Sequence, residues 1–440
     1  MNDYSTTVKT LLSDCISDFA QHSWLYVKRP GMDFTRNRKM SFEDTIKFLI
    51  SMQKTSTKQE LLDYFHFDSD APTQAAFSQQ RAKIRPDTFE LLFHEFNSRL
   101  PHEKNFKGYR LLACDGSAFG IARNPSDTDS YALSDPYGKG FNMIHLNALY
   151  DLCNKTFVDA VLQPYCKMNE KRAFCSMIDR YCNSTSEKTI FIADRGYESL
   201  NIFAHAMENH SRFMIRAKSA ESQRTMLSTF SSEFPDTDEF DIDIKRFLTR
   251  RHTKSVKNQP DIYKFIGNRT FDYLDEKSSI PYFMEFRVIR FLLSNGTYEY
   301  IITNLPRYEF SIPEIKQLYN MRWGIETSFR DLKYSIGLLG FHAKKYDYII
   351  QEIFAKLIMY NFCESITNHI SLGKNTSSKY TFQINCAMAI RICMEFFLRD
   401  CNAPPMNVEA LIGRHLVPIR PNRKAPRHVH SQSARSFIYR

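Results

Sequence analysis

The order of apolar runs between residues 109 and 219 restricts the folds that this chain can adopt. Patterns typical of buried strands occupy 109–117, 143–151, 155–164, 189–196 and 212–219, and amphipathic helical patterns occupy 170–182 and 197–209. An order of three strands, helix, strand, helix and strand is typical of a mixed sheet flanked by helices. The sequence therefore predicts an α/β fold with a mixed sheet for this part of the chain.

The periodicity changes on both sides of that segment. Before it, apolar residues recur at three- and four-residue steps, which predicts helices. After it, the spacing shortens to two residues, and the many aromatic and β-branched residues predict a β-rich insertion. Helix returns at Ser311, where Ser-Ile-Pro-Glu fits a capping box with a proline in the first turn. The predicted parts are a helical N-terminal region (1–105), the first part of a catalytic core (106–220), the insertion (221–308), further core helices (309–370) and a C-terminal helical segment with a basic tail (371–440).

The net charge is concentrated near the C-terminus. The chain carries 59 Lys and Arg against 49 Asp and Glu, a formal charge of +10. Seven of these cations and no carboxylate lie between Gly413 and Arg440, so the rest of the chain is nearly neutral. A basic segment of this kind indicates either a polyanionic partner such as nucleic acid or a solvated tail, and charge alone leaves both open.

Membrane and secreted classes of protein are not indicated. No run of about 18 apolar residues is present, and the N-terminus lacks the basic-then-apolar pattern of a secretory signal, so we expect no membrane partner and a cytoplasmic location. The ten cysteines include no Cys-x-x-Cys pair. A zinc site or a disulfide framework is therefore poorly supported, and reduced thiols are the simplest expectation.

The helical region contains a candidate DNA-binding element. Two short helices around a turn at 67–72 could form a helix-turn-helix, and the alternative is a plain helical subdomain. The second helix would offer side chains suited to bases and phosphates, namely Gln79, Gln80, Arg81 and Lys83. The basic stretch 28–39 is expected to form a loop able to touch a phosphate backbone.

Three carboxylates stand where a site could assemble. Asp115 ends the first strand pattern and Asp194 ends the fourth, and strand ends are where sites form in open α/β sheets. Asp115 could instead shape an Asp-Gly turn, and Asp194 could cap the following helix. The third, Glu326, lies on a long helix predicted over about 312–336.

One face of that predicted helix combines an acid, a phenol and several cations. At about 100° per residue, the side chains of this face fall within an arc of roughly 60°. They are Tyr319, Arg322, Glu326 and Lys333, and Arg330 lies beside them. The alternative is surface ion pairing of Glu326 with Arg322 or Arg330. Cations remain spare after such pairing, and carboxylates beside surplus cations suit phosphate chemistry.

At these residues the chain resembles the cut-and-paste DDE transposases of bacterial insertion sequences. The match is to the group with a Tyr-x2-Arg-x3-Glu-x6-Lys signature, which appears in YNMRWGIETSFRDLK as Tyr319, Arg322, Glu326 and Lys333. Asp-Gly-Ser from Asp115 and Asp-Arg-Gly-Tyr from Asp194 match the other two motifs. The resemblance covers about 70 to 430 and implies a ribonuclease-H-like core with a β-rich insertion before the glutamate helix.

The resemblance implies a metal-dependent chemistry. Asp115, Asp194 and Glu326 would be the catalytic residues and would hold two Mg²⁺ ions, with Mn²⁺ as a substitute. Water would cut the transposon end, the freed 3′-hydroxyl would form a hairpin on the opposite strand, and the reopened end would attack target DNA. The implied partners are double-stranded DNA, as inverted-repeat ends and as target, and a second copy of the chain in a synaptic homodimer. The implied location is the bacterial cytoplasm, associated with the nucleoid.

The side chains around the triad are implied to hold the DNA. Phosphate contacts would come from Tyr319, Arg322, Arg330 and Lys333. Trp323 could stack on an extruded base or be an ordinary core aromatic. Arg195 and Arg216 are further possible DNA contacts, although Arg216 could equally be a surface charge at a strand end.

Two other functions compete with an active transposase. One is a non-catalytic DNA-binding regulator derived from a transposase, and the other is a related metal-dependent nuclease or junction resolvase. Retention of all three carboxylates argues for an enzyme, and the Tyr, Arg and Lys face favours transposition.

Overall fold

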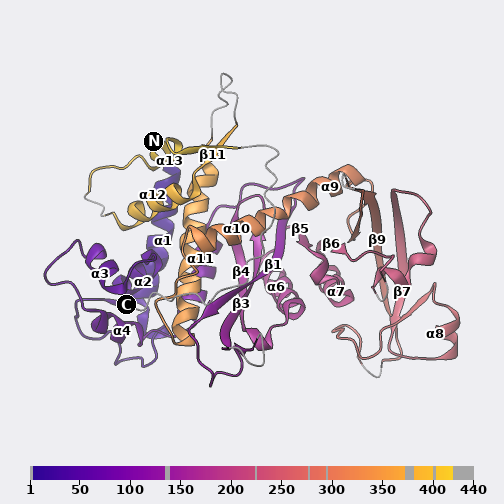
Figure 1. The fold of residues 1–440 in the computed structure, drawn as a ribbon, viewed down its shortest axis with the longest axis horizontal. Coiled ribbons are helices and arrows are strands. Elements are labelled where there is room, and N and C mark those ends of the chain that lie inside the picture. Colours follow the sequence, from indigo (N-terminus) through magenta and orange to yellow (C-terminus); the bar gives the residue numbers. More distant parts are fainter. Residues whose placement is uncertain are drawn as a thin grey trace.

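The computed structural model describes residues 3–133, 139–222, 225–275, 278–293, 296–371, 381–399 and 403–419. Helices of the N-terminal region, a central sheet and the strands of residues 240–303 follow one another along the long axis of the molecule (Figure 1). Most of the predicted basic tail, from residue 420 onward, lies outside the described residues. Within the described ranges, no helix is long and apolar enough to cross a membrane.

The centre of the molecule is a ten-stranded mixed sheet. Its order is β2-β3-β1-β5-β6-β10-β9-β7-β8, and β4 also pairs with β3. The strands are β1 (Arg110–Ile121), β2 (Tyr131–Ala132), β3 (Phe141–Asp151), β4 (Thr156–Pro164), β5 (Thr189–Ala193), β6 (Arg212–Ala217), β7 (Phe240–Thr249), β8 (Tyr263–Phe265), β9 (Tyr282–Leu292) and β10 (Tyr298–Thr303). Strand β5 is parallel to β1 and β6, whereas β3 is antiparallel to β1. The predicted mixed α/β sheet is confirmed, and it fits a ribonuclease-H-like core.

The strands predicted for 221–308 extend this sheet and do not stand apart from it. Strand β10 pairs antiparallel with β6, with Tyr300 opposite Ala217, and β9, β7 and β8 follow outward. This pairing satisfies backbone groups of β6 that would otherwise form an open edge. The sheet therefore runs without interruption from the predicted core into the predicted insertion.

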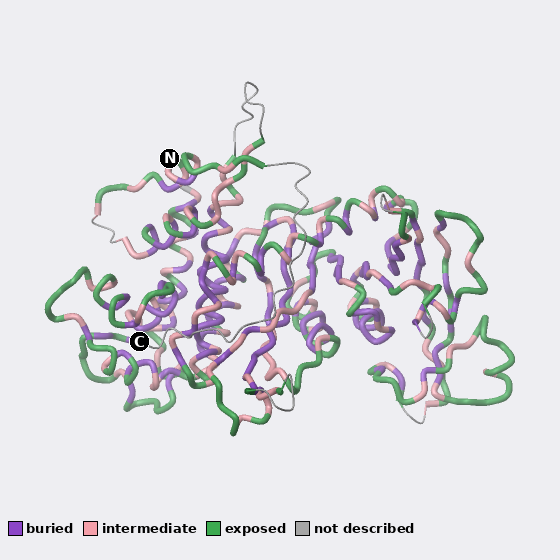
Figure 2. Tube along the Cα trace, in the orientation of Figure 1, coloured by how far each residue is buried: buried purple, intermediate pink, exposed green. Residues whose placement is uncertain are grey.

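Side chains of β1 alternate between two hydrophobic cores. Leu111 and Ala113 belong to the core on the face covered by α10 (Trp323–Tyr334) and α11 (Tyr346–His369). Leu112 and Cys114 belong to the core on the other face, covered by α6 (Glu170–Ser184) and α7 (Leu200–Glu208). Figure 2 shows buried chain along the whole middle of the sheet. The position of a residue along β1 thus decides which helices it faces.

The helical patterns at the N-terminus correspond to helices that pack around α11. These are α1 (Asp3–Gln21), α2 (Phe42–Ser51), α3 (Thr57–Tyr64), α4 (Gln74–Arg81) and α5 (Thr88–Arg99). Helix α11 lies between them and the sheet and is buried along most of its length (Figures 1 and 2). Its apolar residues therefore surround the axis and do not form a single stripe. Two further helices also pack against α11, namely α12 (Cys386–Leu398) and α13 (Val408–Gly413).

The long helix predicted over about 312–336 is divided into α9 (Ile312–Met321) and α10. It begins as predicted, with a capping box between Ser311 and Glu314. At Arg322 the backbone N–H donates to the carbonyl of Tyr319, three residues back, in place of the usual four-residue step. This tighter turn separates the two helices and sets the direction of α10 across the sheet.

Candidate active site

Asp115 lies in the middle of β1, not at its end. The strand continues beyond it to Ile121, and Asp115 stands opposite Ala148 of β3. The predicted Asp-Gly turn is wrong, because the ladder with β3 holds this dipeptide in an extended conformation. Asp115 shares its face of β1 with Leu111 and Ala113, so its side chain lies on the face that α10 covers.

Gly116, the next residue, faces the other side of the sheet and leaves room for a contact between a buried histidine and a partly exposed glutamate. There His145 of β3 places its Nε2 3.0 Å from Oε1 of Glu170, at the start of α6. A Cβ added at Gly116 would lie 2.5 Å from that Nε2 and 2.8 Å from that Oε1. The glycine therefore allows the pair to close directly over the strand beside Asp115. No sequence signal distinguished His145 from other residues of its strand.

A Gly116→Ala substitution is expected to destabilise the protein by about 1–3 kcal/mol, because the added methyl group must displace the His145–Glu170 pair from a packed interior. Urea unfolding followed by circular dichroism measures this effect. Gly120→Ala is the matched control on the same strand, since no atom lies within 4 Å of a Cβ built there. Equal unfolding midpoints for the two variants would contradict the role given to Gly116.

Asp194 directly follows β5, as its motif predicted. Its Oδ1 accepts a hydrogen bond of 2.7 Å from the backbone N–H of Gly196 and so caps the short 3₁₀ turn Arg195–Tyr197. The parallel pairing of β1 with β5 places Cys114 opposite Ala193. Asp115 and Asp194 therefore follow paired residues on adjacent strands, and the capping role does not remove Asp194 from the site.

Glu326 reaches the site from α10, which packs against β1. The Nη2 of Arg322 donates to its Oε1 at 2.9 Å. Further along the helix, Nζ of Lys333 lies 5.1 Å from the centre of the Phe119 ring, on the same face of β1 as Asp115. Glu326 and Lys333 thus both lie between α10 and the strand that carries Asp115.

Two of the three carboxylates act electrostatically on the third, Asp115. Burial raises the pKa of Asp115 to about 6, and the negative charges of Asp194 and Glu326 add to this rise, whereas the Gly116 N–H and Arg322 oppose it. Repulsion among the carboxylates favours any cation that binds between them. The two strand residues and the helix residue therefore lie near enough for two of the acids to act on the third.

The carboxylates of Asp115, Asp194 and Glu326 are the donors that a divalent cation would use at this site. Within the described ranges, no group of three or more His, Cys, Asp or Glu side chains is close enough to hold a metal ion as it stands. Glu326 is engaged with Arg322 and would have to exchange that partner for a cation. Carboxylate oxygens are the ligands that Mg²⁺ and Mn²⁺ prefer, so the chemistry of the donors fits such an ion.

Tyr319 and Arg322 are buried beside strands of the predicted insertion. Both are at most 4% exposed, and the Tyr319 hydroxyl and Arg322 Nε have no hydrogen-bond partner in the described part of the chain. Burial raises the pKa of Tyr319, and the charges of Arg322, Arg216 and Glu299 also act on it. Arg216 of β6 lies 3.5 Å from Glu299 of β10. Glu299 belongs to this site, and nothing in its strand pattern marked it.

The remaining candidates around the triad are more exposed. Trp323 is 56% exposed, so the alternative of a core aromatic is wrong. The side chain of Arg330 is 65% exposed and approaches Asp331 at 3.8 Å. Arg322, and not Arg330, is therefore the partner of Glu326. Arg195 is exposed in the turn after Asp194.

The structure corrects part of the predicted helix-turn-helix. Arg81 is 3% exposed and pairs with Glu352 of α11 at 2.8 Å, so it supports the fold and is not available to DNA. Gln80 is also buried and accepts a hydrogen bond of 2.6 Å from Lys83. Gln79 is exposed.

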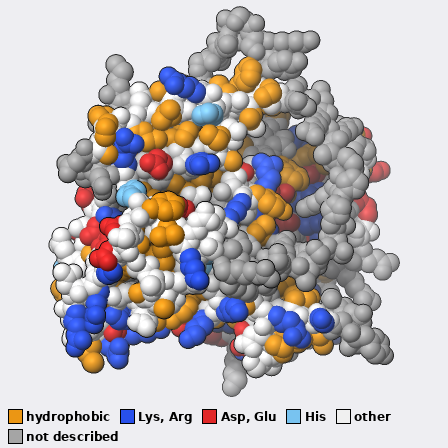
Figure 3. Space-filling model, turned by 60° about the vertical axis from the view of Figure 1, so that its left-hand side comes forward, with side chains coloured by type: hydrophobic (Ala, Val, Ile, Leu, Met, Phe, Trp, Pro, Cys, Tyr) orange, Lys and Arg blue, Asp and Glu red, His pale blue; other side chains and the backbone are white. Residues whose placement is uncertain are grey.

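The cations of the basic stretch 28–39 are also exposed. From the side of the N-terminal helices, Figure 3 shows Lys and Arg side chains spread over this surface among apolar ones. The predicted contact between this stretch and a phosphate backbone remains a prediction.

The chain is similar to known proteins over most of its length. Residues 106–362 match the family model described as Transposase DDE domain. No curated protein sequence matches the chain. Among solved structures, the chain is similar to a piggyBac transposase in a synaptic complex with hairpin DNA, at 10% sequence identity and a TM-score of 0.47, over 92% of this chain and 83% of that one. The family model covers more than half of the chain and includes Asp115, Asp194 and Glu326, so the chain belongs to the DDE transposase family.

Proposed function

We propose that this protein is a DNA transposase that cuts at transposon ends and joins them to target DNA. Asp115, Asp194 and Glu326 are its catalytic residues. The observation that supports this most directly is the convergence of these carboxylates beside Arg322, where the charges of Asp194 and Glu326 help to raise the pKa of Asp115. Such a site can hold cations through its acids and phosphates through its arginine.

The three carboxylates would hold divalent cations, two Mg²⁺ ions with Mn²⁺ as a substitute. When bound, such ions stabilise charge on the attacking and leaving oxygens of a phosphodiester. The carboxylates would position these ions where β1 and β5 lie beside α10. Glu326 would exchange Arg322 for a cation, and this exchange would leave the guanidinium of Arg322 available to a DNA phosphate.

Arg322 and its neighbours on α9 and α10 would hold the DNA strand. Once released, the guanidinium can bind a phosphate with two parallel hydrogen bonds, and its buried Nε already lacks a partner in the described part of the chain. Tyr319 and Lys333 add a hydroxyl and a positive charge on the same side, and Arg330 extends the charge outward. Exposed Trp323 is available to stack on an extruded base.

The finer features of the reaction follow the sequence resemblance. We assign the chain to the bacterial insertion-sequence group that cuts and pastes through a hairpin, because its four-residue signature is complete. Joining two ends requires two active sites, so a homodimer on double-stranded DNA is proposed. Its place of action would be the bacterial cytoplasm at the nucleoid, and exposed Arg195 and Gln79 would be further DNA contacts.

The test is a cleavage reaction with the protein and linear DNA that carries the inverted repeats flanking its coding region. With Mg²⁺ or Mn²⁺ we expect nicks at both ends, then hairpins and an excised fragment, resolved on denaturing gels. Chelation by EDTA should stop every step. Specific binding without cleavage in either metal would favour the regulator, and cleavage without strand transfer to a target plasmid would favour the nuclease or resolvase.

A further inference from the structure

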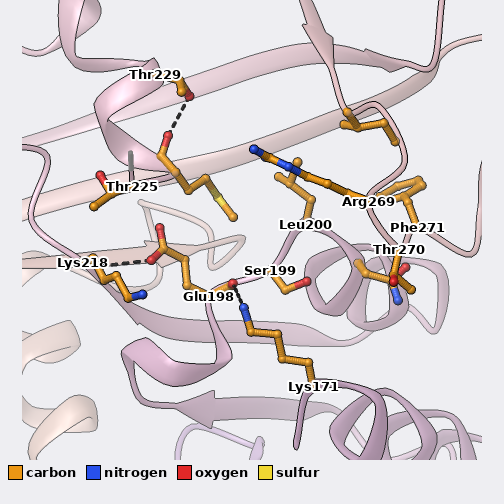
Figure 4. A pocket seen from close by; sticks show the side chains of 13 residues that line it. Lys171, Glu198, Ser199, Leu200, Lys218, Thr225, Thr229, Arg269, Thr270 and Phe271 are labelled. Atoms are coloured by element: carbon orange, nitrogen blue, oxygen red, sulfur yellow. Dashed lines mark hydrogen bonds between the residues drawn. The ribbon is translucent and has the colours of Figure 1, made fainter. Parts of the chain in front are cut away.

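A cavity lies on the opposite face of the sheet from Glu326. It has a volume of about 430 Å³ and opens where α7 begins, between α6 and residues 266–271 (Figure 4). Its wall includes Leu200 and Ile266, which belong to the core on the α6 and α7 face. It also includes Glu198, four residues after Asp194. The cavity is thus linked to the active site through one short turn but shares no catalytic carboxylate with it.

Three cations line this cavity. Lys171 donates a hydrogen bond of 2.6 Å from Nζ to the backbone carbonyl of Glu198. Lys218 and Arg269 are exposed, and neither forms an ion pair with a described residue. Figure 4 shows Arg269 extending from the opposite wall toward the space beside Glu198. The N-terminus of α7 also faces this space and has no acidic residue in its first turn. These groups together suit a phosphate.

Glu198 favours a ligand that carries a hydrogen-bond donor in addition to a phosphate. Its side chain is only 8% exposed, and Oε2 accepts a hydrogen bond of 3.3 Å from the backbone N–H of Lys218. Its other oxygen, Oε1, is buried and makes no hydrogen bond of good geometry with a described residue, although the backbone N–H of Met226 also acts on this carboxyl. A buried acceptor in this state favours a ligand that brings a hydrogen-bond donor, such as the exocyclic amino group of a nucleobase.

The rest of the wall suits a flat apolar group. Leu200, Met226 and Phe271 line it beside Glu198. A base could lie against these side chains with its edge toward the carboxylate. A volume of about 430 Å³ is at the lower end of the range for small-molecule sites and is large enough for one nucleotide.

We propose that this cavity binds a single nucleotide, with its phosphate at Lys218 and Arg269 and the amino group of its base donating to Oε1 of Glu198. The same chemistry could come from an unpaired nucleotide of a DNA strand or from a free nucleotide. The proposal goes beyond the reaction at the triad, and it requires binding only.

The test compares two nucleotides that differ at one edge. Calorimetric titration of the full chain with dCMP should show saturable binding, and the monophosphate of deoxyzebularine, which has hydrogen where dCMP has its amino group, should bind at least about fivefold more weakly. Lys218→Gln and Arg269→Gln should each weaken dCMP binding about tenfold, through loss of a charge-assisted contact. Lys254→Gln, at an exposed lysine of α8 (Lys254–Asn258), is the matched control and should leave binding unchanged.

Competition then identifies the source of the ligand. A short single-stranded oligonucleotide that displaces dCMP from the parent protein identifies a DNA strand as the occupant, and failure to displace it identifies a free nucleotide. Absence of saturable dCMP binding, equal affinity for the deoxyzebularine monophosphate, or equal loss in the Lys254 variant would overturn the proposal. No cleavage step enters the assay, so these results are independent of whether the protein is an active transposase.

Discussion

Glu326→Gln is expected to abolish end cleavage, with a rate loss of about 10³-fold or more, while binding of the inverted-repeat DNA changes only a few-fold. Glutamine keeps the size of the side chain and can still accept from Arg322, but it lacks the negative charge that a cation between the three acids requires. Single-turnover cleavage in Mg²⁺ and a gel-shift titration with the same DNA measure the two quantities.

Glu103→Gln is the matched control, because this carboxylate is exposed in the loop before β1. Its cleavage rate should equal that of the parent protein. Near-parental cleavage by the Glu326 variant would remove Glu326 from the catalytic residues. A comparable loss of DNA binding in that variant would instead point to a folding defect, which circular dichroism would detect.

Arg81→Met is expected to lower the free energy of unfolding by about 3–5 kcal/mol, because it leaves a buried carboxylate without its main cationic partner. Arg81 donates to Gln351 at 3.0 Å and to Glu352 at 2.8 Å, and both partners are buried. Burial opposes ionisation of Glu352, but Arg81 and His342 outweigh it and hold the pKa of Glu352 at about 2. Urea unfolding measures the loss.

Arg85→Met provides the control, since Arg85 is exposed and pairs with exposed Asp87. Its effect on the free energy of unfolding should stay below about 1 kcal/mol.

The pH dependence of the stability loss shows whether the charge of Glu352 causes it. Glu352 has a folded-state pKa below its ordinary value, so its contribution is present above about pH 4.5 and is lost as the pH falls toward 2. The difference between the Arg81 variant and the parent should therefore shrink below about pH 4.5. If the stability difference between the Arg81 variant and the parent does not change with pH, the unpaired charge of Glu352 is not its cause.

The order of strands and helices could be predicted because it depends on local patterns. Alternation along β1 and the apolar run of β5 identify their strands without knowledge of their partners. The end of β1 was predicted wrongly for the same reason. Asp-Gly favours a turn in isolation, whereas ten residues of β1 pair with β3, and this long ladder overrides the local preference.

Pairs that join distant parts of the chain could not be predicted. Arg81 was a candidate for DNA contact because it lies on the second helix of a possible helix-turn-helix, yet its partner Glu352 stands 271 positions away. His342 has no acidic neighbour in sequence, but it lies 3.3 Å from Glu60 and 3.8 Å from Glu352. Burial opposes its protonation, and these two carboxylates nevertheless raise its pKa to about 9.

The helix face around Glu326 was the most informative part of the sequence. Its spacing placed Tyr319, Arg322 and Glu326 together, and the structure also brings them to one side of the sheet. The spacing could not show that Arg322 and Tyr319 would be buried while Arg330 points outward. That difference arises from the tight turn at Arg322 and from Glu299 and Arg216, which approach from the sheet.

The continuous sheet also bears on aggregation and on how the chain can be shortened. Strand β10 covers the side of β6 that would otherwise present unpaired N–H and C=O groups to solvent. A chain trimmed of residues 221–308 would therefore expose a template for pairing with strands of other molecules. These residues protect the strands that carry Asp115 and Asp194 from self-association, so a shortened form of this protein must retain them.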